Sequence, residues 1–329
     1  MTTPTGPLHR PRRLRTSAAM RRLVAQTRLG VDDLVAPLFV REGIDEPHPI
    51  SSLPGVVQHT RESLVAEVGE LVDLSIPSVI LFGVPRTKDA VGSGASDPDG
   101  IVQLALRDVR DRFGDQIVVM ADLCLDEYTD HGHCGIVRPD GVVDNDATLE
   151  RYAEVAVAQA AAGAHVVAPS GMMDGQVAAI RAALDGTGAV DVAILAYAAK
   201  YASGLYGPFR EAVDVEIADG GDRTTYQQDP RNARESLAEV ALDLAEGADM
   251  VMVKPAVTYL DVLAEVRAMV DVPLGAYQVS GEYAMVHAAA ANGWIDGDRV
   301  ALEQLTAIKR AGADLILTYF AKAAASWLA

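Results

Sequence analysis

The sequence Ala161-Ala-Gly-Ala-His-Val-Val-Ala168 joins the end of an expected helix to a short apolar run. The same pattern returns in Ala245-Glu-Gly-Ala-Asp-Met-Val-Met252 and in Ala311-Gly-Ala-Asp-Leu-Ile-Leu317. In each copy an amphipathic segment stops at a glycine, which favours the end of a helix. The continuous apolar run that follows is typical of a parallel strand buried on both faces. The repeat therefore predicts helices that alternate with parallel strands.

The same alternation, followed along the whole chain, predicts eight strands. They lie near 34–40, 78–83, 116–123, 164–169, 191–197, 249–253, 273–278 and 314–319. Helical patterns separate them, for instance over 148–162, 232–246 and 299–310. Eight such alternations favour a (β/α)8 TIM barrel. An open doubly wound sheet is the alternative, but the sequence contains neither G-x-G-x-x-G nor G-x-x-x-x-G-K-[ST].

The charge of the chain is unevenly distributed. Residues 1–30 contain seven arginines and no acidic residue, whereas the remaining residues are 21 basic and 46 acidic, a net charge of −25. So acidic a body argues against a nucleic-acid partner. We expect residues 1–30 to be an arm that docks on a neighbouring subunit of a homo-oligomer, and residues 31–329 to be one catalytic domain. A transit peptide and a nucleic-acid tail are the alternatives for the arm.

Two further signals concern the location of the protein. No run of about 18 apolar residues occurs, so the sequence predicts no membrane span and no membrane partner. No apolar segment with a small-residue cleavage site follows the first residues either. We therefore expect a cytoplasmic protein.

One connection is too long for a simple turn of a barrel. About thirty residues separate the strand near 191–197 from the helix near 232–246, and they include Tyr201, Tyr206, Phe209 and Tyr226. Long loops are usually functional or disordered, and four aromatic residues argue against disorder. We expect a lid over about 201–230.

Two lysines stand where strands end. Lys200 follows the apolar run near 191–197, and Lys254 ends the run Met250-Val-Met-Val253. In a barrel such positions face the active site, as they do for Asp122, Ser280 and Tyr319, which also follow or end strands. Two ammonium groups in one apolar mouth depress each other's pKa. A neutral amine attacks ketones, so the pair indicates Schiff-base chemistry; a lysine that only pairs with a carboxylate is the alternative.

Arginines and possible metal ligands complete the candidate site. Arg210 and Arg223 flank the expected lid and could bind a substrate carboxylate as a fork, or could be surface charges. Cys124, Asp126 and Cys134 would supply two thiolates and a carboxylate and leave a fourth position open, in the style of a catalytic zinc site. His131 and His133 are possible substitutes, and a polar turn that binds no metal is the alternative.

Several motifs, in order, resemble the porphobilinogen synthase (delta-aminolevulinic acid dehydratase) family. The resemblance as a whole runs from about residue 10 to the C-terminus. The motifs are Phe82-Gly-Val-Pro85, Lys88-Asp89, Gly92-Ser93, Tyr197-Ala-Ala-Lys-Tyr-Ala-Ser-Gly-Leu-Tyr-Gly-Pro-Phe-Arg-Glu211, Gly221-Asp-Arg-Thr-Thr-Tyr-Gln227, Met252-Val-Lys-Pro255, Tyr277-Gln-Val-Ser-Gly-Glu-Tyr283 and Thr318-Tyr-Phe320.

The resemblance implies a hydro-lyase of tetrapyrrole (heme) biosynthesis that condenses two 5-aminolevulinate molecules to porphobilinogen. It implies a Schiff base at Lys254 with one substrate, whose carboxylate meets Ser280 and Tyr319. It implies a second Schiff base at Lys200, with Arg210 and Arg223 on the other carboxylate. Asp122 would carry protons and Phe209 would belong to the closing lid. No organic cofactor is implied.

The chain departs from the family pattern at two metal sites. Zinc-dependent members resemble C-x-C-x7-C, whereas Asp126 here takes the middle position, so the resemblance implies a weakened zinc site. Glu239 matches a family glutamate for a regulatory magnesium ion. The segment that orients this ion's waters in relatives resembles Pro-Ser-Asp-Met-Met-Asp-Gly-Arg, but here it is Pro169-Ser-Gly-Met-Met-Asp-Gly-Gln176. Octamer, hexamer and dimer therefore stay open, with the octamer expected first.

Two other functions compete with the synthase hypothesis. A class I aldolase-like barrel would need only one Schiff-base lysine. An inactive barrel that serves as a binding or assembly subunit would be expected to have lost a lysine, an arginine or Tyr319, and all of these are present. We therefore expect the synthase.

Overall fold

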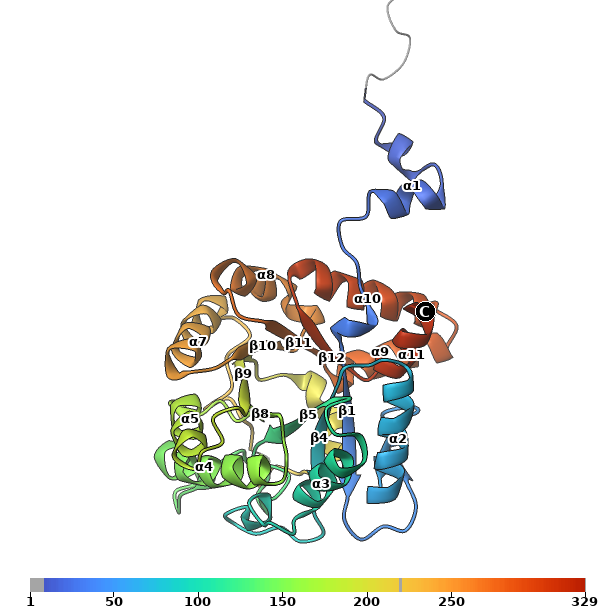
Figure 1. Cartoon of the computed structure of the whole chain (residues 1–329). Helices are drawn as coiled ribbons and strands as arrows, with labels where there is room; N and C mark the ends of the chain where they lie inside the picture. The colour runs from blue at the N-terminus through green and yellow to red at the C-terminus, as the bar shows by residue number, and fades with distance from the viewer. Residues whose placement is uncertain (1–8, 219–220, 329) are drawn as a thin grey trace, which may run out of the picture.

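The computed structural model describes residues 9–218 and 221–328 and forms a closed barrel of eight parallel strands (Figure 1). The barrel strands are β1 (Leu34–Arg41), β4 (Ser78–Val84), β5 (Val118–Leu123), β8 (Val166–Pro169), β9 (Ala193–Lys200), β10 (Met250–Lys254), β11 (Leu274–Gln278) and β12 (Leu315–Thr318). Each strand pairs with the next, and β1 closes the ring by pairing with β12 in the register Leu34↔Ile316. The predicted TIM barrel is confirmed, with each strand close to its expected position.

Helices surround the barrel on its outside (Figure 1). They are α2 (Arg61–Asp73), α3 (Ile101–Phe113), α4 (Asn145–Ala161), α5 (Gln176–Gly186), α7 (Ala233–Glu246), α8 (Leu260–Met269), α9 (Ser280–Ala291), α10 (Gly297–Ala311) and α11 (Ala321–Leu328). Each presents an apolar side to the strands, as α3 does with Val102, Leu106 and Val109 at helical spacing. All seven residues of β4 are buried, as expected for a strand covered on both faces.

The three repeated glycines end their helices by the expected mechanism. Gly163, Gly247 and Gly312 follow α4, α7 and α10 and have φ values of 100°, 105° and 121°. This left-handed region is costly for residues with a Cβ atom but open to glycine. The chain can therefore turn at once from the end of each helix into the next strand.

Shorter elements lie outside this frame. A two-stranded extension, β2 (His48–Pro49) with β3 (Val57–His59), joins the edge of β1, and β6 (Ile136–Val137) pairs with β7 (Val143–Asp144). The segment after β9 forms the turn η4 (Gly204–Tyr206) and the short helix α6 (Gly207–Ala212). Among the described helices, none is both long enough and apolar enough to cross a membrane.

The described part of the arm, residues 9–30, stands away from the barrel over its first two elements (Figure 1), whereas Leu29 packs against the core. The arm forms η1 (Pro11–Arg15) and α1 (Ala18–Leu23), and neither element has a buried residue. Leu23 is 75% exposed. Residues 1–8 of the expected arm, 219–220 of the expected lid and 329 of the expected domain lie outside the described residues.

Candidate active site

Lys200 and Lys254 are the last residues of β9 and β10, and the two positions are direct partners in the pairing of these strands. Both side chains are buried and meet in one narrow pocket at the carboxyl ends of the strands. The pocket is lined by Phe82, Asp122, Asp126, Glu127, Ser170, Lys200, Tyr206, Phe209, Arg210, Arg223 and Lys254. The structure thus brings together seven of the residues that the sequence predicted for the site.

An irregularity in β9 shapes this pocket. The register runs from Ala196↔Val251 to Ala199↔Val253, so β9 contains one residue more than β10 over this stretch. A β-bulge of this kind changes which way the following side chains point. Tyr197 and Lys200, three positions apart, would face opposite sides of a regular strand. Here the Tyr197 ring centre lies 5.7 Å from Lys200 Nζ and 5.1 Å from Lys254 Nζ.

Aromatic rings surround the ammonium group of Lys254. Its Nζ lies between 4.5 and 5.3 Å from the ring centres of Tyr197, Tyr206, Phe209 and Tyr277. Burial lowers the pKa of Lys254 to about 7, and the charge of Lys200 acts in the same direction. Asp122 opposes this shift. A substantial fraction of Lys254 is therefore an uncharged, nucleophilic amine near neutral pH.

Asp122 lies within β5 and faces both lysines. Burial raises its pKa to about 6, against the opposite effect of Lys254 and Lys200. The Ser170 hydroxyl donates to Asp122 Oδ2 at 3.1 Å, while Lys200 Nζ donates to the Ser170 carbonyl. A carboxyl group with a pKa near neutrality can both give and accept protons, which is the requirement for a general acid–base group.

The two arginines have different surroundings. Arg223 is buried and forms an ion pair with Asp126 at 2.7 Å, and it also donates to the Gly132 carbonyl at 2.8 Å. Burial acts to raise the pKa of Asp126, but the Arg223 guanidinium holds it well below its usual range. Arg210 lines the pocket without a carboxylate partner among the described residues. One guanidinium is thus available to a ligand, and the other is already engaged.

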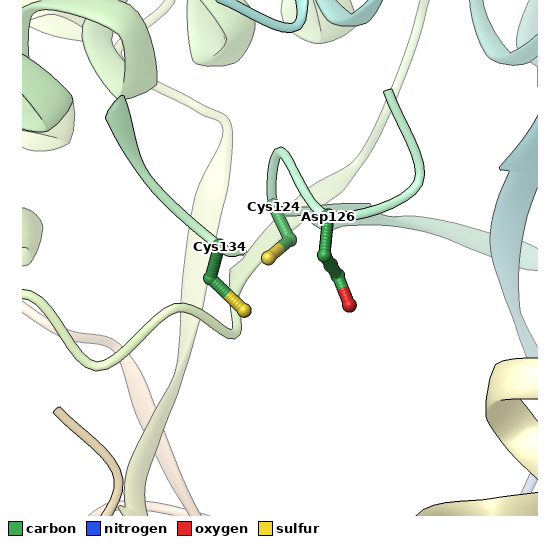
Figure 2. A group of neighbouring side chains, drawn as sticks. All are labelled: Cys124, Asp126 and Cys134. Atoms are coloured by element: carbon green, nitrogen blue, oxygen red, sulfur yellow. The ribbon is translucent and has the colours of Figure 1, made fainter. Parts of the chain in front are cut away.

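Cys124, Asp126 and Cys134 form a buried group that can bind a metal ion. One ligand atom from each lies within 4.8 Å of the others. Figure 2 shows the two sulfur atoms directed toward one another, with the Asp126 carboxylate beside them. Two thiols and a carboxylate suit a zinc-like ion with one position left open, so the donor set fits. The group contains neither His131 nor His133, the substitutes considered from the sequence.

Ser280 and Tyr319 border the site without lining the narrow pocket. Ser280 begins α9, and its hydroxyl accepts from the backbone N–H of Phe209 at 3.0 Å. Tyr319 follows β12, and its hydroxyl lies 3.0 Å from that of Tyr277, one of the rings around Lys254. Both residues therefore contact the aromatic wall around the reactive amine.

Glu239 lies elsewhere, on α7. It is half-buried and lines a separate cavity that also contains Asp174 and Asn145. Gly171, where the resemblance implies an aspartate, packs against Tyr152: a Cβ atom there would lie 1.6 Å from the Tyr152 hydroxyl. The space that an aspartate would need near this cavity is therefore taken by a tyrosine.

Some pocket residues were not among the predicted site residues. Tyr206 and Tyr277 stood within the quoted motifs, and Glu127 is adjacent to Asp126. Both carboxyl oxygens of Glu127 are buried without a hydrogen-bond partner among the described residues. Their position in the sequence, within a motif or next to a predicted ligand, could have indicated these three residues as part of the site. Tyr197 also begins a quoted motif, but that it faces the two amines depends on the bulge in β9 and could not be predicted from spacing.

Comparisons with known proteins agree with this geometry. The family model "Delta-aminolevulinic acid dehydratase" matches residues 8–327. Curated proteins of that name from Streptomyces coelicolor and Mycobacterium tuberculosis are 64% and 61% identical, covering 95% and 100% of this chain and 94% and 100% of their own lengths. A crystal structure of delta-aminolevulinic acid dehydratase (porphobilinogen synthase) from Toxoplasma gondii, in complex with the reaction product porphobilinogen, superposes with a TM-score of 0.95. It is 44% identical, and the match covers 97% of this chain and 91% of that one. This chain belongs to the delta-aminolevulinic acid dehydratase family.

Proposed function

We propose that this protein is a porphobilinogen synthase, a hydro-lyase of tetrapyrrole biosynthesis. It condenses two molecules of 5-aminolevulinate to porphobilinogen with loss of water. The observation that carries the proposal is the pair Lys200 and Lys254. The two residues are direct partners on neighbouring strands in one narrow pocket, and the pKa of Lys254 is lowered to about 7. An aldolase-like barrel would need only one of these lysines.

Each lysine binds one substrate through its ketone. The uncharged amine of Lys254 attacks the carbonyl carbon of the first 5-aminolevulinate, and loss of water gives a Schiff base. Lys200 does the same with the second molecule. Because the two amines end neighbouring strands, the two bound substrates lie side by side. This proximity replaces an encounter in solution with a reaction inside one complex.

The carboxylates of the substrates give each molecule its orientation. The hydroxyls of Ser280 and Tyr319 receive the carboxylate of the molecule on Lys254. Arg210 and Arg223 receive the other carboxylate. Arg210 has no carboxylate partner among the described residues, whereas Arg223 must exchange Asp126 for the substrate. Guanidinium forks suit carboxylates because they offer two parallel donors.

Asp122 moves protons in this proposal. Conversion of a Schiff base to its enamine removes a proton from carbon, and the loss of water requires a proton on the leaving oxygen. A carboxyl group with a pKa of about 6 can serve both steps.

Phe209 belongs to the proposed lid over about 201–230. Its ring covers the amine of Lys254 and excludes water from it.

The metal proposal concerns Cys124, Asp126 and Cys134 as ligands of a zinc ion. Such an ion would supply Lewis acidity beside the second substrate. Asp126 is a harder ligand than the thiolate of zinc-dependent relatives, which favours weaker zinc binding.

Glu239 is proposed as a ligand of a regulatory magnesium ion. Compared with the segment that the resemblance implies, Gly171 lacks a carboxylate and Gln176 lacks a positive charge.

The proposal for assembly is a homo-oligomer, an octamer first, with hexamer and dimer as alternatives. The arm supports it. The described arginines of the arm form no ion pair within the described residues, and the rest of the chain is strongly acidic, so the arm suits a neighbouring subunit.

The proposed location is the cytoplasm. The two cysteines are free thiols, as is usual in this reducing compartment.

The test is porphobilinogen formation from 5-aminolevulinate by the purified protein, with and without EDTA, and with Lys254→Ala as the inactive control. We expect product from the wild type and none from the variant. Loss of product in EDTA with recovery in zinc supports the metal site. Product that is indifferent to EDTA retains the synthase and removes the essential metal. Absence of product under every metal condition rejects the proposed function.

A further inference from the structure

The short helix α6 carries two pocket residues, Phe209 and Arg210, and its C-terminal end is held by distant side chains. The last carbonyls of any helix lack partners within the helix. Here the Gln58 amide donates to the Ala212 carbonyl at 2.7 Å. Lys88 Nζ donates to the next two carbonyls, those of Val213 at 3.2 Å and Asp214 at 2.7 Å. A cation at this end is also favoured by the helix dipole.

These donors come from the first third of the chain. Gln58 lies in β3, and Lys88 follows β4. Arg41, at the end of β1, donates to the Gln58 side-chain oxygen at 2.9 Å and also pairs with Asp214. The hydroxyl of Ser51 donates to the Glu211 carboxylate, and the backbone N–H of Ser51 donates to the same oxygen at 3.0 Å. We call Arg41, Ser51, Gln58 and Lys88 the α6 clamp.

The clamp has a consequence for Arg210. Among the described residues no carboxylate pairs with Arg210, and its Nε atom is buried without a hydrogen-bond partner. Side-chain partners therefore do not set the position of this guanidinium. The backbone of α6 sets it instead, together with the packing of the neighbouring Phe209 ring on Phe82, at 5.2 Å between ring centres.

We propose that Lys88 is a positioning residue for the reaction, because it holds the end of α6 so that Arg210 points into the pocket and can bind a substrate carboxylate. The inference rests on the proposed function, in which Arg210 receives the carboxylate of the second 5-aminolevulinate. Lys88 is well suited to this task. Its side chain is half-buried, and its Nζ lies within hydrogen-bond distance of two carbonyls at the end of α6. Burial lowers the pKa of Lys88, and the charges of Glu127 and Asp126 oppose this shift.

The first test compares steady-state kinetics of Lys88→Met, Lys88→Arg and the matched control Lys309→Met. Lys309 pairs with Asp33, outside the pocket. Loss of one charge-assisted contact predicts a KM for 5-aminolevulinate about 10-fold higher in Lys88→Met. Because binding and not chemistry is impaired, kcat should change less than KM. Lys88→Arg should recover most of the affinity, and Lys309→Met should behave as wild type.

Hydrogen exchange provides a readout that does not depend on activity. Amides over 207–216 should exchange faster in Lys88→Met than in wild type, while those over 250–262, which follow Lys254, keep their rates. Borohydride trapping of substrate at Lys254 should persist. An unchanged KM together with unchanged exchange over 207–216 overturns the inference.

The inference stays testable if Lys88→Met does not fold and if the wild type forms no product. If Lys88→Met does not fold, Ser51→Ala tests the same clamp at an exposed contact and should raise KM a few-fold with faster exchange over 207–216; no change in either measurement overturns the inference. If wild type forms no porphobilinogen, the proposed function fails. The exchange of Lys88→Met then still decides whether Lys88 holds α6.

Discussion

Lys200 and Lys254 are partners in register at the last positions of two neighbouring parallel strands, and one tyrosine ring, that of Tyr197, lies within 5.7 Å of both ammonium nitrogens. Parallel strands end at the same edge of a sheet, so the two side chains enter one pocket from adjacent positions. This relationship makes one amine sensitive to the charge of the other, and it leads to the first two predictions.

The two lysines should differ in their effect on trapping. Lys254→Ala should abolish both turnover and borohydride trapping of substrate, because the amine that forms the first Schiff base is missing. Lys200→Ala should lower kcat by about a hundredfold or more and leave trapping at Lys254 intact. The measurement is mass spectrometry of the reduced adduct, with Lys309→Ala as the control. Trapping that survives unchanged in Lys254→Ala contradicts this assignment.

The pH dependence of trapping should follow the amine of Lys254. With a pKa of about 7, the uncharged fraction rises from about one tenth at pH 6 to about nine tenths at pH 8, so the trapping rate should rise over this range. Lys200→Met removes a like charge and should move the profile to higher pH. Asp122→Asn removes a carboxylate that favours the ammonium and should move it to lower pH. A profile identical in all three proteins would argue against coupling of these groups.

The ion pair between Asp126 and Arg223 should contribute to stability as a buried pair. Asp126→Asn leaves a guanidinium that is 7% exposed without its charge partner, and we expect a loss of about 3–5 kcal/mol in the free energy of unfolding. Urea unfolding in EDTA measures this loss without a contribution from bound metal. The matched control is Asp140→Asn, which breaks an exposed pair with Arg138 and should have no measurable effect. Equal results for the two variants would refute the prediction.

Gly171 should be intolerant of a side chain because of Tyr152. A Cβ atom at position 171 would lie 1.6 Å from the Tyr152 hydroxyl, which donates to the Cys134 carbonyl at 2.6 Å. Gly171→Ala should therefore destabilise the protein by about 1–3 kcal/mol and weaken metal binding to the cysteines. Thermal unfolding and elemental analysis check both effects. Gly186→Ala is the control, since no atom lies within 4 Å of a Cβ atom there.

Much of the fold follows from local features of the sequence. Glycines at 163, 247 and 312 end helices because only glycine adopts the required backbone without strain, and the apolar runs after them become buried strands. These causes act within a few residues of one another, so the pattern alone predicts the order of helices and strands. The same local reasoning places Lys200 and Lys254 at strand ends, since barrel strands point their last residues toward the site.

The tertiary structure decided what no local pattern contains. Asp126 and Arg223 pair across nearly a hundred positions of chain, and Tyr197 faces the pocket only because one extra residue in β9 changes its direction. The end of α6 is likewise held by Lys88, more than a hundred positions earlier. The sequence by itself determined the barrel and the candidate chemical groups, because capping and periodicity are local. Closure of the barrel decides which side chains form ion pairs, which are enclosed by aromatic rings and which keep no partner. Contacts, burial and the resulting pKa values arise only when distant segments pack together.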